Sequence, residues 1–286
     1  MNLDSLLARN IPDFLLRQGV RRMLARKLKR ETINEVEAHQ KYLQDFVEKL
    51  KSQPIAVNTE EANRQHYELP PEFFQLFLGS RMKYSCGYWA GQFNKRVPDE
   101  GLDRSEEDML ELTCRRAGLE DGQDILELGC GWGTLCLHMA RSYPGSRVTA
   151  VSNSVSQIDL IRDRAKEQGL DNLNLITADI NSFELSEQFD RVVSVEMFEH
   201  MRNYGKLMHK VAESLKDGGR LFVHIFTHRC HPFLYEDRKA GDWMTRNFFS
   251  GGTMPSQDLL HYFTEELFLE KQWAISGTHY SKTLEA

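Results

Sequence analysis

The sequence has no long apolar run, no strong excess of one charge and no pattern of paired cysteines. No apolar run reaches the ~18–20 residues that a membrane-spanning helix needs, and residues 1–30 contain no continuous apolar stretch of the signal-peptide type. The formal net charge of −6 excludes nucleic-acid binding by overall electrostatic attraction. These absences predict a soluble, cytoplasmic protein.

Cysteine is scarce. Five cysteines occur among 286 residues, their number is odd, and no two form a Cys-x-x-Cys pair. This argues against a disulfide framework and against a zinc site. We therefore predict reduced thiols and no bound metal. The five are Cys86, Cys114, Cys130, Cys136 and Cys230.

The charge is distributed unevenly near the N-terminus. Residues 14–29 include no acidic residue. Val20, Leu24 and Leu28 recur every four residues, which predicts a basic amphipathic helix over about residues 17–30. Such a helix either packs on the core, the interpretation that we favour, or touches an anionic lipid surface transiently. The basic residues are Arg17, Arg21, Arg22, Arg26, Lys27, Lys29 and Arg30.

Short apolar segments alternate with helical segments from residue 105 onward. This alternation predicts an α/β, Rossmann-like fold with a mostly parallel sheet and helices on both faces. Residues 216–219, Lys-Asp-Gly-Gly, are typical of a turn ahead of the fifth strand. The strands are predicted over 124–128, 148–151, 173–177, 191–195 and 220–226, and the helices over 105–117, 134–142, 154–168 and 204–215.

The flanking segments differ from this core. Residues 1–100 are first helical and polar and then rich in aromatic residues, which indicates either a pocket wall or ordinary core packing. Residues 228–286 break the alternation, and their aromatic and glycine-rich content predicts a lid over the carboxyl edge of the sheet. We expect a helical cap over 1–100, a cofactor-binding core over 101–227, and a substrate-covering insertion with the last strands over 228–286.

A glycine-rich loop follows the first predicted strand. Gly129, Gly131 and Gly133 let the backbone turn sharply and approach a ligand, and the helix behind them offers free N–H groups. The GxGxG spacing behind an acid differs from the GxGxxG of dinucleotide folds. S-adenosylmethionine (AdoMet) has no phosphate but carries an α-amino cation, which Glu127 is placed to neutralise. We predict that Glu127 and the three glycines bind AdoMet.

Two further loops at the carboxyl edge are predicted to complete the AdoMet site. The second strand ends in Ser152 and Asn153, with Gln157 one turn into the next helix, and these polar groups can hydrogen-bond the ribose hydroxyls. After the third strand, Asp179 is predicted to accept a hydrogen bond from the adenine amino group, with Ile180 packing on the ring. The alternative is that Asp179 only caps a helix.

The fourth strand runs into a loop that carries Glu196, Glu199 and His200. Two carboxylates and an imidazole within five residues, at the edge where ligands bind, predict general-base chemistry. Methyl transfer to an amine needs such a base, because an ammonium nitrogen has no lone pair with which to attack. The alternative is a helix N-terminus enriched in acids because of the helix dipole.

Several separated motifs, in order, resemble the cyclopropane fatty acid synthase superfamily of AdoMet-dependent methyltransferases. They lie at residues 66–70, 83–89, 127–133, 196–204 and 249–256, and the resemblance covers about residues 60–286. The segments EMFEHMRNY and FFSGGTMPS are most similar to the coclaurine N-methyltransferase branch. The resemblance implies the class I methyltransferase fold, with AdoMet as co-substrate and a small-molecule, cyclic or alkaloid-like amine as acceptor.

The resemblance also implies roles for individual residues. Tyr84 and Ser85 resemble AdoMet contacts made from the N-terminal cap. The loop with Glu196, Glu199 and His200 matches the part that handles the substrate amine, and Glu68 is expected to join it. Lipid-modifying members hold a bicarbonate ion, so bicarbonate is a second expected ligand, and the matching positions are Cys86, Glu199, His224 and Tyr280.

Two other functions stay open at this point. One is cyclopropane-fatty-acyl-phospholipid synthase activity, which the basic N-terminal helix favours. The other is a non-catalytic AdoMet-binding subunit. The family pattern around residues 278–284 normally continues into further helices, so we expect either a truncated form or a missing part of the substrate cover. The sequence predicts no oligomeric state.

Overall fold

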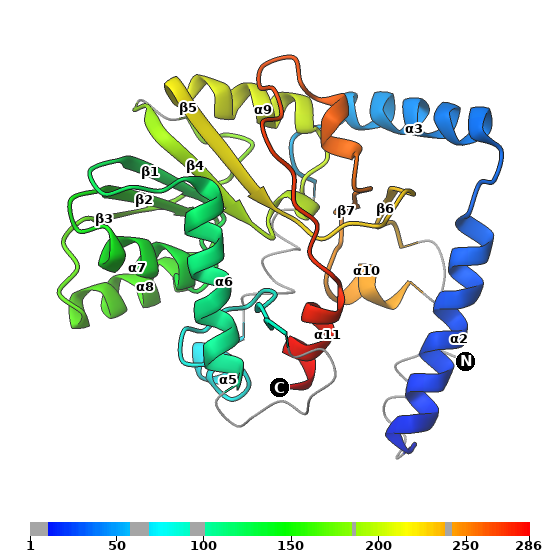
Figure 1. Ribbon diagram of the computed structural model, residues 1–286, viewed down its shortest axis with the longest axis horizontal. Coiled ribbons are helices and arrows are strands. Elements are labelled where there is room, and N and C mark those ends of the chain that lie inside the picture. The colour runs from blue at the N-terminus through cyan, green and yellow to red at the C-terminus, as the bar shows by residue number, and fades with distance from the viewer. Residues whose placement is uncertain (1–10, 58–68, 92–100, 185–186, 238–241) are drawn as a thin grey trace. The chain divides into compact units, whose positions relative to one another are not determined.

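The computed structural model describes residues 11–57, 69–91, 101–184, 187–237 and 242–286 (Figure 1). The chain forms two compact units that interleave along the sequence. The first, which we call the sheet unit, comprises residues 63–198, 205–225 and 264–286. The second, which we call the helical unit, comprises residues 1–62, 199–204 and 226–263. The three consecutive segments expected from the sequence stay a prediction.

A five-stranded parallel sheet forms the centre of the sheet unit. Its order is β3-β2-β1-β4-β5, and each pair of neighbours is parallel. The direction of the chain across the sheet reverses between β1 and β4, and ligands bind beyond the carboxyl ends of strands at such a point. The strands are β1 (Asp124–Leu128), β2 (Arg147–Ser152), β3 (Leu173–Thr177), β4 (Phe189–Val195) and β5 (Leu215–His224).

Helices cover both faces of this sheet. Apolar side chains of α6 (Gly101–Ala117), α7 (Thr134–Ser142) and α8 (Val155–Glu167) join alternate strand residues, such as Val148 and Ala150, in one buried cluster, because successive strand side chains point to opposite faces. Helix α9 (Tyr204–Glu213) connects β4 to β5, in the opposite direction across the sheet from α7 and α8. Right-handed connections therefore place α9 on the other face.

The predicted fold is confirmed, and the predicted strands and helices between residues 105 and 226 agree with the structure to within a few residues. One local prediction is wrong. Residues 216–219 do not precede β5 as a turn but form an irregularity within it. Phe189 of β4 pairs with Leu215, but Arg191 pairs with Arg220, so the register of the two strands shifts between these pairs. Gly218 has φ +74°, a conformation that glycine adopts without strain.

The helical unit is assembled from three stretches of chain. The apolar residues of α3 recur at helical spacing and form its buried face. The elements of the unit are α2 (Asp13–Glu31), α3 (Val36–Lys51), α10 (Trp243–Asn247), the 3-10 helix η2 (Leu259–Tyr262), and the antiparallel pair β6 (Phe233–Leu234) and β7 (Thr253–Met254).

The shortest of these stretches, residues 199–204, is fixed within the helical unit by backbone contacts. The Asn203 side-chain amide donates to the carbonyl oxygens of Lys51 and Gln53, both at 2.8 Å. Gly252 permits a close approach, because a Cβ at that position would lie 2.7 Å from the Glu199 carbonyl oxygen. Two motifs that are well separated in the sequence, one with Met201 and the other with Thr253, therefore lie together next to Glu199.

Candidate active site

Three glycines shape the loop between β1 and α7. Gly129 and Gly133 have φ values of +82° and +84°, and Cβ atoms there would lie 2.7 Å from Met197 Cγ and 2.5 Å from Ile161 Cγ1. Gly131 has φ +50°, but a Cβ there would meet no atom within 4 Å. Packing and backbone conformation thus both require glycine at positions 129 and 133. Gly131 instead leaves space that a ligand can use.

Glu127 lies next to this loop, near the end of β1, and is 2% exposed. Burial raises the pKa of its carboxyl to about 8, although a backbone hydrogen bond of Cys136 and the charge of Lys83 act in the opposite direction. Among the described residues, its Oε2 atom has no hydrogen-bond partner. A bound cation would supply that partner and favour the ionised form. The residue therefore fits the α-ammonium group of AdoMet.

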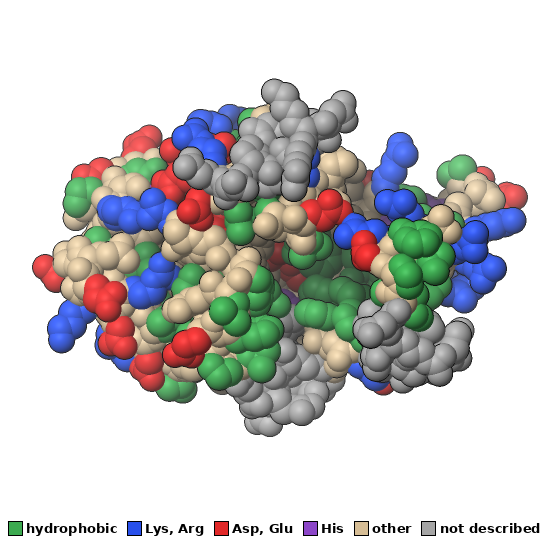
Figure 2. Space-filling model, turned by 90° about the horizontal axis from the view of Figure 1, so that it is seen from below, with side chains coloured by type: hydrophobic (Ala, Val, Ile, Leu, Met, Phe, Trp, Pro, Cys, Tyr) green, Lys and Arg blue, Asp and Glu red, His purple; other side chains and the backbone are tan. Residues whose placement is uncertain are grey.

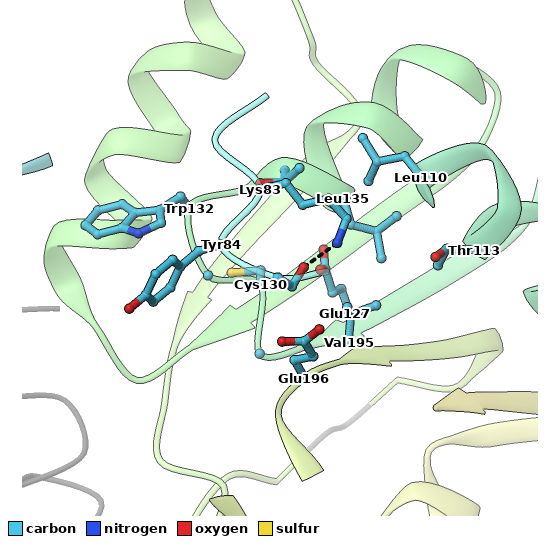
Figure 3. A pocket seen from close by; sticks show the side chains of 14 residues that line it. Lys83, Tyr84, Leu110, Thr113, Glu127, Cys130, Trp132, Leu135, Val195 and Glu196 are labelled. Atoms are coloured by element: carbon cyan, nitrogen blue, oxygen red, sulfur yellow. Dashed lines mark hydrogen bonds between the residues drawn. The ribbon is translucent and has the colours of Figure 1, made fainter. Parts of the chain in front are cut away.

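A cavity of about 70 Å³ adjoins Glu127 (Figure 3). Ser85 and Gly131 line it, as do Tyr84 and Gly129, and Glu196 contributes a second carboxylate. This volume corresponds to a few water-sized groups, so it suits the polar end of a ligand and not a whole nucleoside. The predicted cofactor residues that do not line it are Gly133, Ser152, Asn153, Gln157, Asp179 and Ile180.

The loop after β2 is held by side-chain hydrogen bonds. Ser152 Oγ donates to Gln157 Oε1 at 2.7 Å, and Ser154 caps α8 by accepting the Gln157 N–H at 3.4 Å. In the described part of the chain, the buried Gln157 Nε2 has no hydrogen-bond partner. An amide nitrogen is a donor, so this atom fits a ribose hydroxyl. Asn153 lies between these residues, partly buried.

The loop after β3 forms a local turn around Asp179. Its Oδ1 accepts the N–H of Asn181 at 2.7 Å, and its carbonyl oxygen accepts the N–H of Phe183 at 2.8 Å. These contacts close a turn. No helix begins in the described residues 178–184, so Asp179 does not cap a helix there, and its adenine role stays a prediction. Ile180 is partly buried, and its carbonyl oxygen accepts a hydrogen bond from Lys210 Nζ at 2.9 Å.

Glu106 of α6 anchors the segment that carries Tyr84 and Ser85. Its carboxylate accepts the N–H groups of Gly79 and Arg81, both at 3.1 Å, and of Lys83 at 3.3 Å. Burial raises the pKa of Glu106, and these three hydrogen bonds oppose that rise. The backbone of this segment is therefore tied to α6 at several points before it reaches the cavity.

Helix α11 (Thr278–Glu285) fixes the other end of the same segment. The N–H of Trp89 donates to His279 Nδ1 at 2.8 Å. The N–H of Gly87 donates to Thr283 Oγ1 at 3.0 Å. Residues close to the C-terminus of the chain thereby position residues that line the cofactor cavity.

Glu196 is the centre of a cluster at the end of β4. Its Oε1 accepts the N–H of Cys86 at 2.9 Å, and its Oε2 accepts the O–H of Tyr280 at 2.6 Å. Burial raises the pKa of the Glu196 carboxyl, while the charge of Lys83 acts against that rise. The residue has φ +49°, and a non-glycine residue in this region is strained. Such strain is frequent at functional sites.

The same contacts involve two of the residues predicted to hold bicarbonate, and the bicarbonate site stays a prediction. The backbone N–H of Cys86 and the O–H of Tyr280, from two of the four predicted ligands, donate to the Glu196 carboxylate. Burial lowers the pKa of His224 to about 3, so its neutral imidazole offers no positive charge to an anion. A bicarbonate ion next to Glu196 would meet a like charge. We therefore assign no step to bicarbonate.

Glu199 lies in the helical unit and is 1% exposed. Burial raises the pKa values of Tyr204 and Tyr235, and the charge of Glu199 raises them further. The His200 ring stacks on Phe249 with centroids 5.5 Å apart, and Phe249 stacks on Tyr235 at 4.8 Å. A carboxylate among aromatic faces suits an organic cation.

The family described as mycolic acid cyclopropane synthetase matches residues 56–286, which is most of the chain. The chain belongs to this family.

This member of the cyclopropane synthetase family is similar to alkaloid-methylating enzymes. It is 38% identical to (S)-coclaurine N-methyltransferase from Papaver somniferum over 96% of this chain and 77% of that protein. A crystal structure of coclaurine N-methyltransferase bound to N-methylheliamine and SAH (S-adenosylhomocysteine) is 36% identical with a TM-score of 0.90, over 96% of this chain and 78% of that one. A cyclopropane synthase from Mycobacterium tuberculosis, at 22% identity and TM-score 0.68 over 80% and 81% of the two chains, shares the fold.

These findings confirm the predicted activity, because they show that this chain is an AdoMet-dependent methyltransferase. SAH is the product left when AdoMet has given up its methyl group. The unpartnered atoms Glu127 Oε2 and Gln157 Nε2 fit the amino and ribose ends of AdoMet. The sulfonium of the bound co-substrate supplies the electrophilic methyl group.

Sequence reasoning did not identify several residues that build the site. Glu106, His279 and Thr283 position the segment 79–89, and Lys83 lines the cavity. Lys83 had an available signal, because it lies beside Tyr84 in a motif that was already singled out. His279 and Thr283 likewise lie in the family pattern at residues 278–284, whereas Glu106 had no such signal. Glu68 lies outside the described residues.

Two kinds of feature are absent from the described part of the chain. No group of three or more His, Cys, Asp or Glu side chains in that part is placed to hold a metal ion. In the same residues, no helix is both long and apolar enough to cross a membrane.

Proposed function

We propose that this enzyme transfers the AdoMet methyl group to the nitrogen of a small-molecule amine of cyclic or alkaloid-like type. The observation that carries the proposal is the buried Glu199 carboxylate among the aromatic rings of the helical unit. Such surroundings favour an organic cation over a neutral lipid chain. The coclaurine N-methyltransferase relatives support the same class of acceptor.

Glu199 and His200 take the role of proton acceptors in this proposal. An amine that arrives as an ammonium must lose a proton before its nitrogen can attack, and a positioned base contributes about 10²–10⁴ to the rate of such reactions. Phe249 and Tyr235 face the cationic forms of substrate and product. Alignment of the two reactants supplies a further large part of the rate.

The direct test is turnover with a panel of cyclic secondary amines. The full chain is incubated with AdoMet and each amine, and methylated amine and SAH are quantified by mass spectrometry. We expect at least one amine to gain a methyl group, with one SAH formed for each. Absence of product from the whole panel, with AdoMet binding intact, would reject an amine acceptor of this type.

Lipid modification is the second candidate. The result that would support it is methylation of phospholipid vesicles that depends on added bicarbonate and is lost in Glu199→Gln. The hydrogen bonds from Cys86 and Tyr280 to Glu196 weigh against it, because these donors are then not available to an anion. Turnover of either acceptor would eliminate the third candidate, a non-catalytic AdoMet-binding subunit.

Helix α2 is a candidate for transient contact with an anionic membrane surface. None of its residues is buried, contrary to the favoured interpretation that it packs on the core. Leu24 and Leu28 are 53% and 50% exposed, and Figure 2 shows Lys and Arg side chains beside hydrophobic ones on the surface. Lys27 Nζ lies 3.8 Å from the Phe233 ring centroid. Basic charge beside exposed apolar residues suits anionic lipid.

Vesicle flotation tests this contact. We expect the full chain to float with vesicles that contain anionic phosphatidylserine but not with vesicles of phosphatidylcholine alone. The double variant R22E/R26E should lose the association, whereas K41E/K49E, which changes the same number of charges on α3, should keep it. Equal flotation with both vesicle types would contradict a contact of this kind.

A reducing, cytoplasmic location is also part of the proposal. All five cysteines are free thiols, and four of them are buried. Burial raises the pKa values of Cys86 and Cys114 to about 12, so these thiols stay protonated and unreactive. Alkylation of the protein in lysate, followed by mass spectrometry, should find all five thiols reduced.

A further inference from the structure

Lys83 is a buried lysine in the cofactor cavity to which no role has been assigned. It is 4% exposed, and its backbone N–H is tied to Glu106. Its Nζ donates to the Ser85 hydroxyl. Figure 3 shows its side chain and that of Glu127 pointing toward one another, one from the segment before α6 and the other from β1. Hydrogen bonds at the backbone N–H and at Nζ thus hold Lys83 in place at the cavity.

The ammonium of Lys83 has more hydrogen-bond donors than its contact with Ser85 uses. Burial lowers the pKa of Lys83, and the charges of Glu196, Cys86, Glu106 and Glu127 raise it. Among the described residues, the Ser85 hydroxyl accepts the hydrogen bond that Nζ donates. An ammonium has three N–H donors, so two of them are left for a ligand. A buried charge without a partner is costly.

AdoMet offers the partner that is lacking. Its amino-acid end carries an ammonium and a carboxylate on the same carbon, so a matching site needs an acceptor and a cationic donor close together. Glu127 supplies the acceptor, because its Oε2 has no hydrogen-bond partner in the described part of the chain. Lys83 supplies the donor on the facing side of the same cavity. The two side chains form a charge pair that is complementary to the zwitterion.

We propose that the Lys83 ammonium, oriented by Ser85, binds the α-carboxylate of AdoMet and makes the enzyme selective for co-substrates with an intact amino-acid end. A sulfonium nucleoside that lacks the carboxylate would leave the buried ammonium without a counter-charge. Sites that hydrogen-bond a ligand group reject analogues without that group for this reason. The inference concerns co-substrate binding only, so it does not depend on the identity of the amine.

Calorimetry with AdoMet and with decarboxylated AdoMet tests the proposal. We expect the wild-type full chain to bind AdoMet about 100-fold more tightly than the decarboxylated analogue. In Lys83→Met, which keeps the length of the side chain, AdoMet affinity should fall about 100-fold while affinity for the analogue stays the same or rises. The ratio of the affinities for AdoMet and for the decarboxylated analogue should then approach one. Ser85→Ala should give a smaller loss of the same preference.

Two results would overturn the proposal. One is wild-type protein that binds both ligands equally well, a measurement that needs no variant. The other is a Lys83→Met protein that loses affinity for both ligands by the same factor, because a purely structural lysine would have that effect. Lys216→Met serves as the matched control. Lys216 pairs with Asp124 and Asp190 at 2.8 Å, does not line the cavity, and should leave the preference unchanged.

Discussion

The cofactor cavity of the sheet unit and the surroundings of Glu199 in the helical unit are built in different ways. Most of the residues that line the cavity come from two short runs of the chain, within residues 83–85 and 127–135. The surroundings of Glu199 combine a six-residue stretch with Tyr235, Phe249 and Gly252 from a distant part of the chain. Co-substrate binding therefore depends on local motifs and the amine acceptor on dispersed residues, and substitutions should separate the two.

The largest separation is expected for Glu199→Gln. Removal of the base should lower kcat for amine methylation about 10²–10⁴-fold, while the affinity for AdoMet measured by calorimetry stays unchanged. Glu213→Gln, an exposed change on α9, is the matched control and should keep full activity. If Glu199→Gln weakens AdoMet binding as much as turnover, the two sites are not functionally distinct.

Glu127→Gln should have the opposite pattern, with AdoMet binding weakened about 100-fold because a charge-assisted contact to the ammonium is lost.

The same substitution should also change the free energy of unfolding in a direction that depends on pH. Burial raises the folded-state pKa to about 8 from an ordinary value of 4.5, so the contribution of Glu127 to stability is lost as pH rises from 4.5 through 8. Without AdoMet, the variant should be more stable than wild type at pH 9, by about 1–2 kcal/mol. Urea unfolding of the variant and of wild type at pH 5 and pH 9 measures this difference. If the variant and wild type differ by the same free energy of unfolding at both pH values, Glu127 does not carry a buried charge at pH 9.

A pair of glycine substitutions tests whether the loop serves packing or ligand access. Gly129→Ala should lower the free energy of unfolding by about 2–3 kcal/mol, because its Cβ would overlap Met197 at 2.7 Å. Gly131→Ala should cost about 1 kcal/mol, for the backbone conformation alone, yet should weaken AdoMet binding. Chemical denaturation and calorimetry on both variants provide the comparison. Equal loss of stability in the two would contradict the distinction.

The smallest effect concerns pH. Because AdoMet requires ionised Glu127 and the pKa of that group is about 8, affinity for AdoMet should rise about tenfold between pH 6 and pH 7. The dependence should vanish in Glu127→Gln. A wild-type affinity that does not vary over this range would show that the carboxylate is already ionised before the ligand binds.

Much of the sheet unit could be predicted from the sequence because its information is local. The apolar run over 124–128 and the glycines behind it define a strand, a turn and a helix without reference to distant residues. The parallel order of the strands follows from the helices between them. The irregularity in β5 was mistaken for a turn, because glycines at 218 and 219 mark a break in a strand as well as its beginning.

The arrangement around Glu196 could not be predicted because it depends on contacts across long sequence separations. Cys86 and Tyr280 were matched to a bicarbonate ion, whereas in the structure both donate to Glu196. The positive φ of Glu196, which directs its side chain, leaves no trace in a local pattern. The anchoring of segment 79–89 by Glu106 and α11 is likewise visible only in three dimensions.

The interleaving of the two units restricts how this enzyme can diversify. Each unit consists of three stretches, so the chain passes from one unit to the other five times between its ends. No single cut or gene fusion can exchange one unit as a cassette. New acceptor preferences must therefore arise through individual substitutions in place, and engineering by exchange of whole segments between homologues should mostly give proteins that do not assemble.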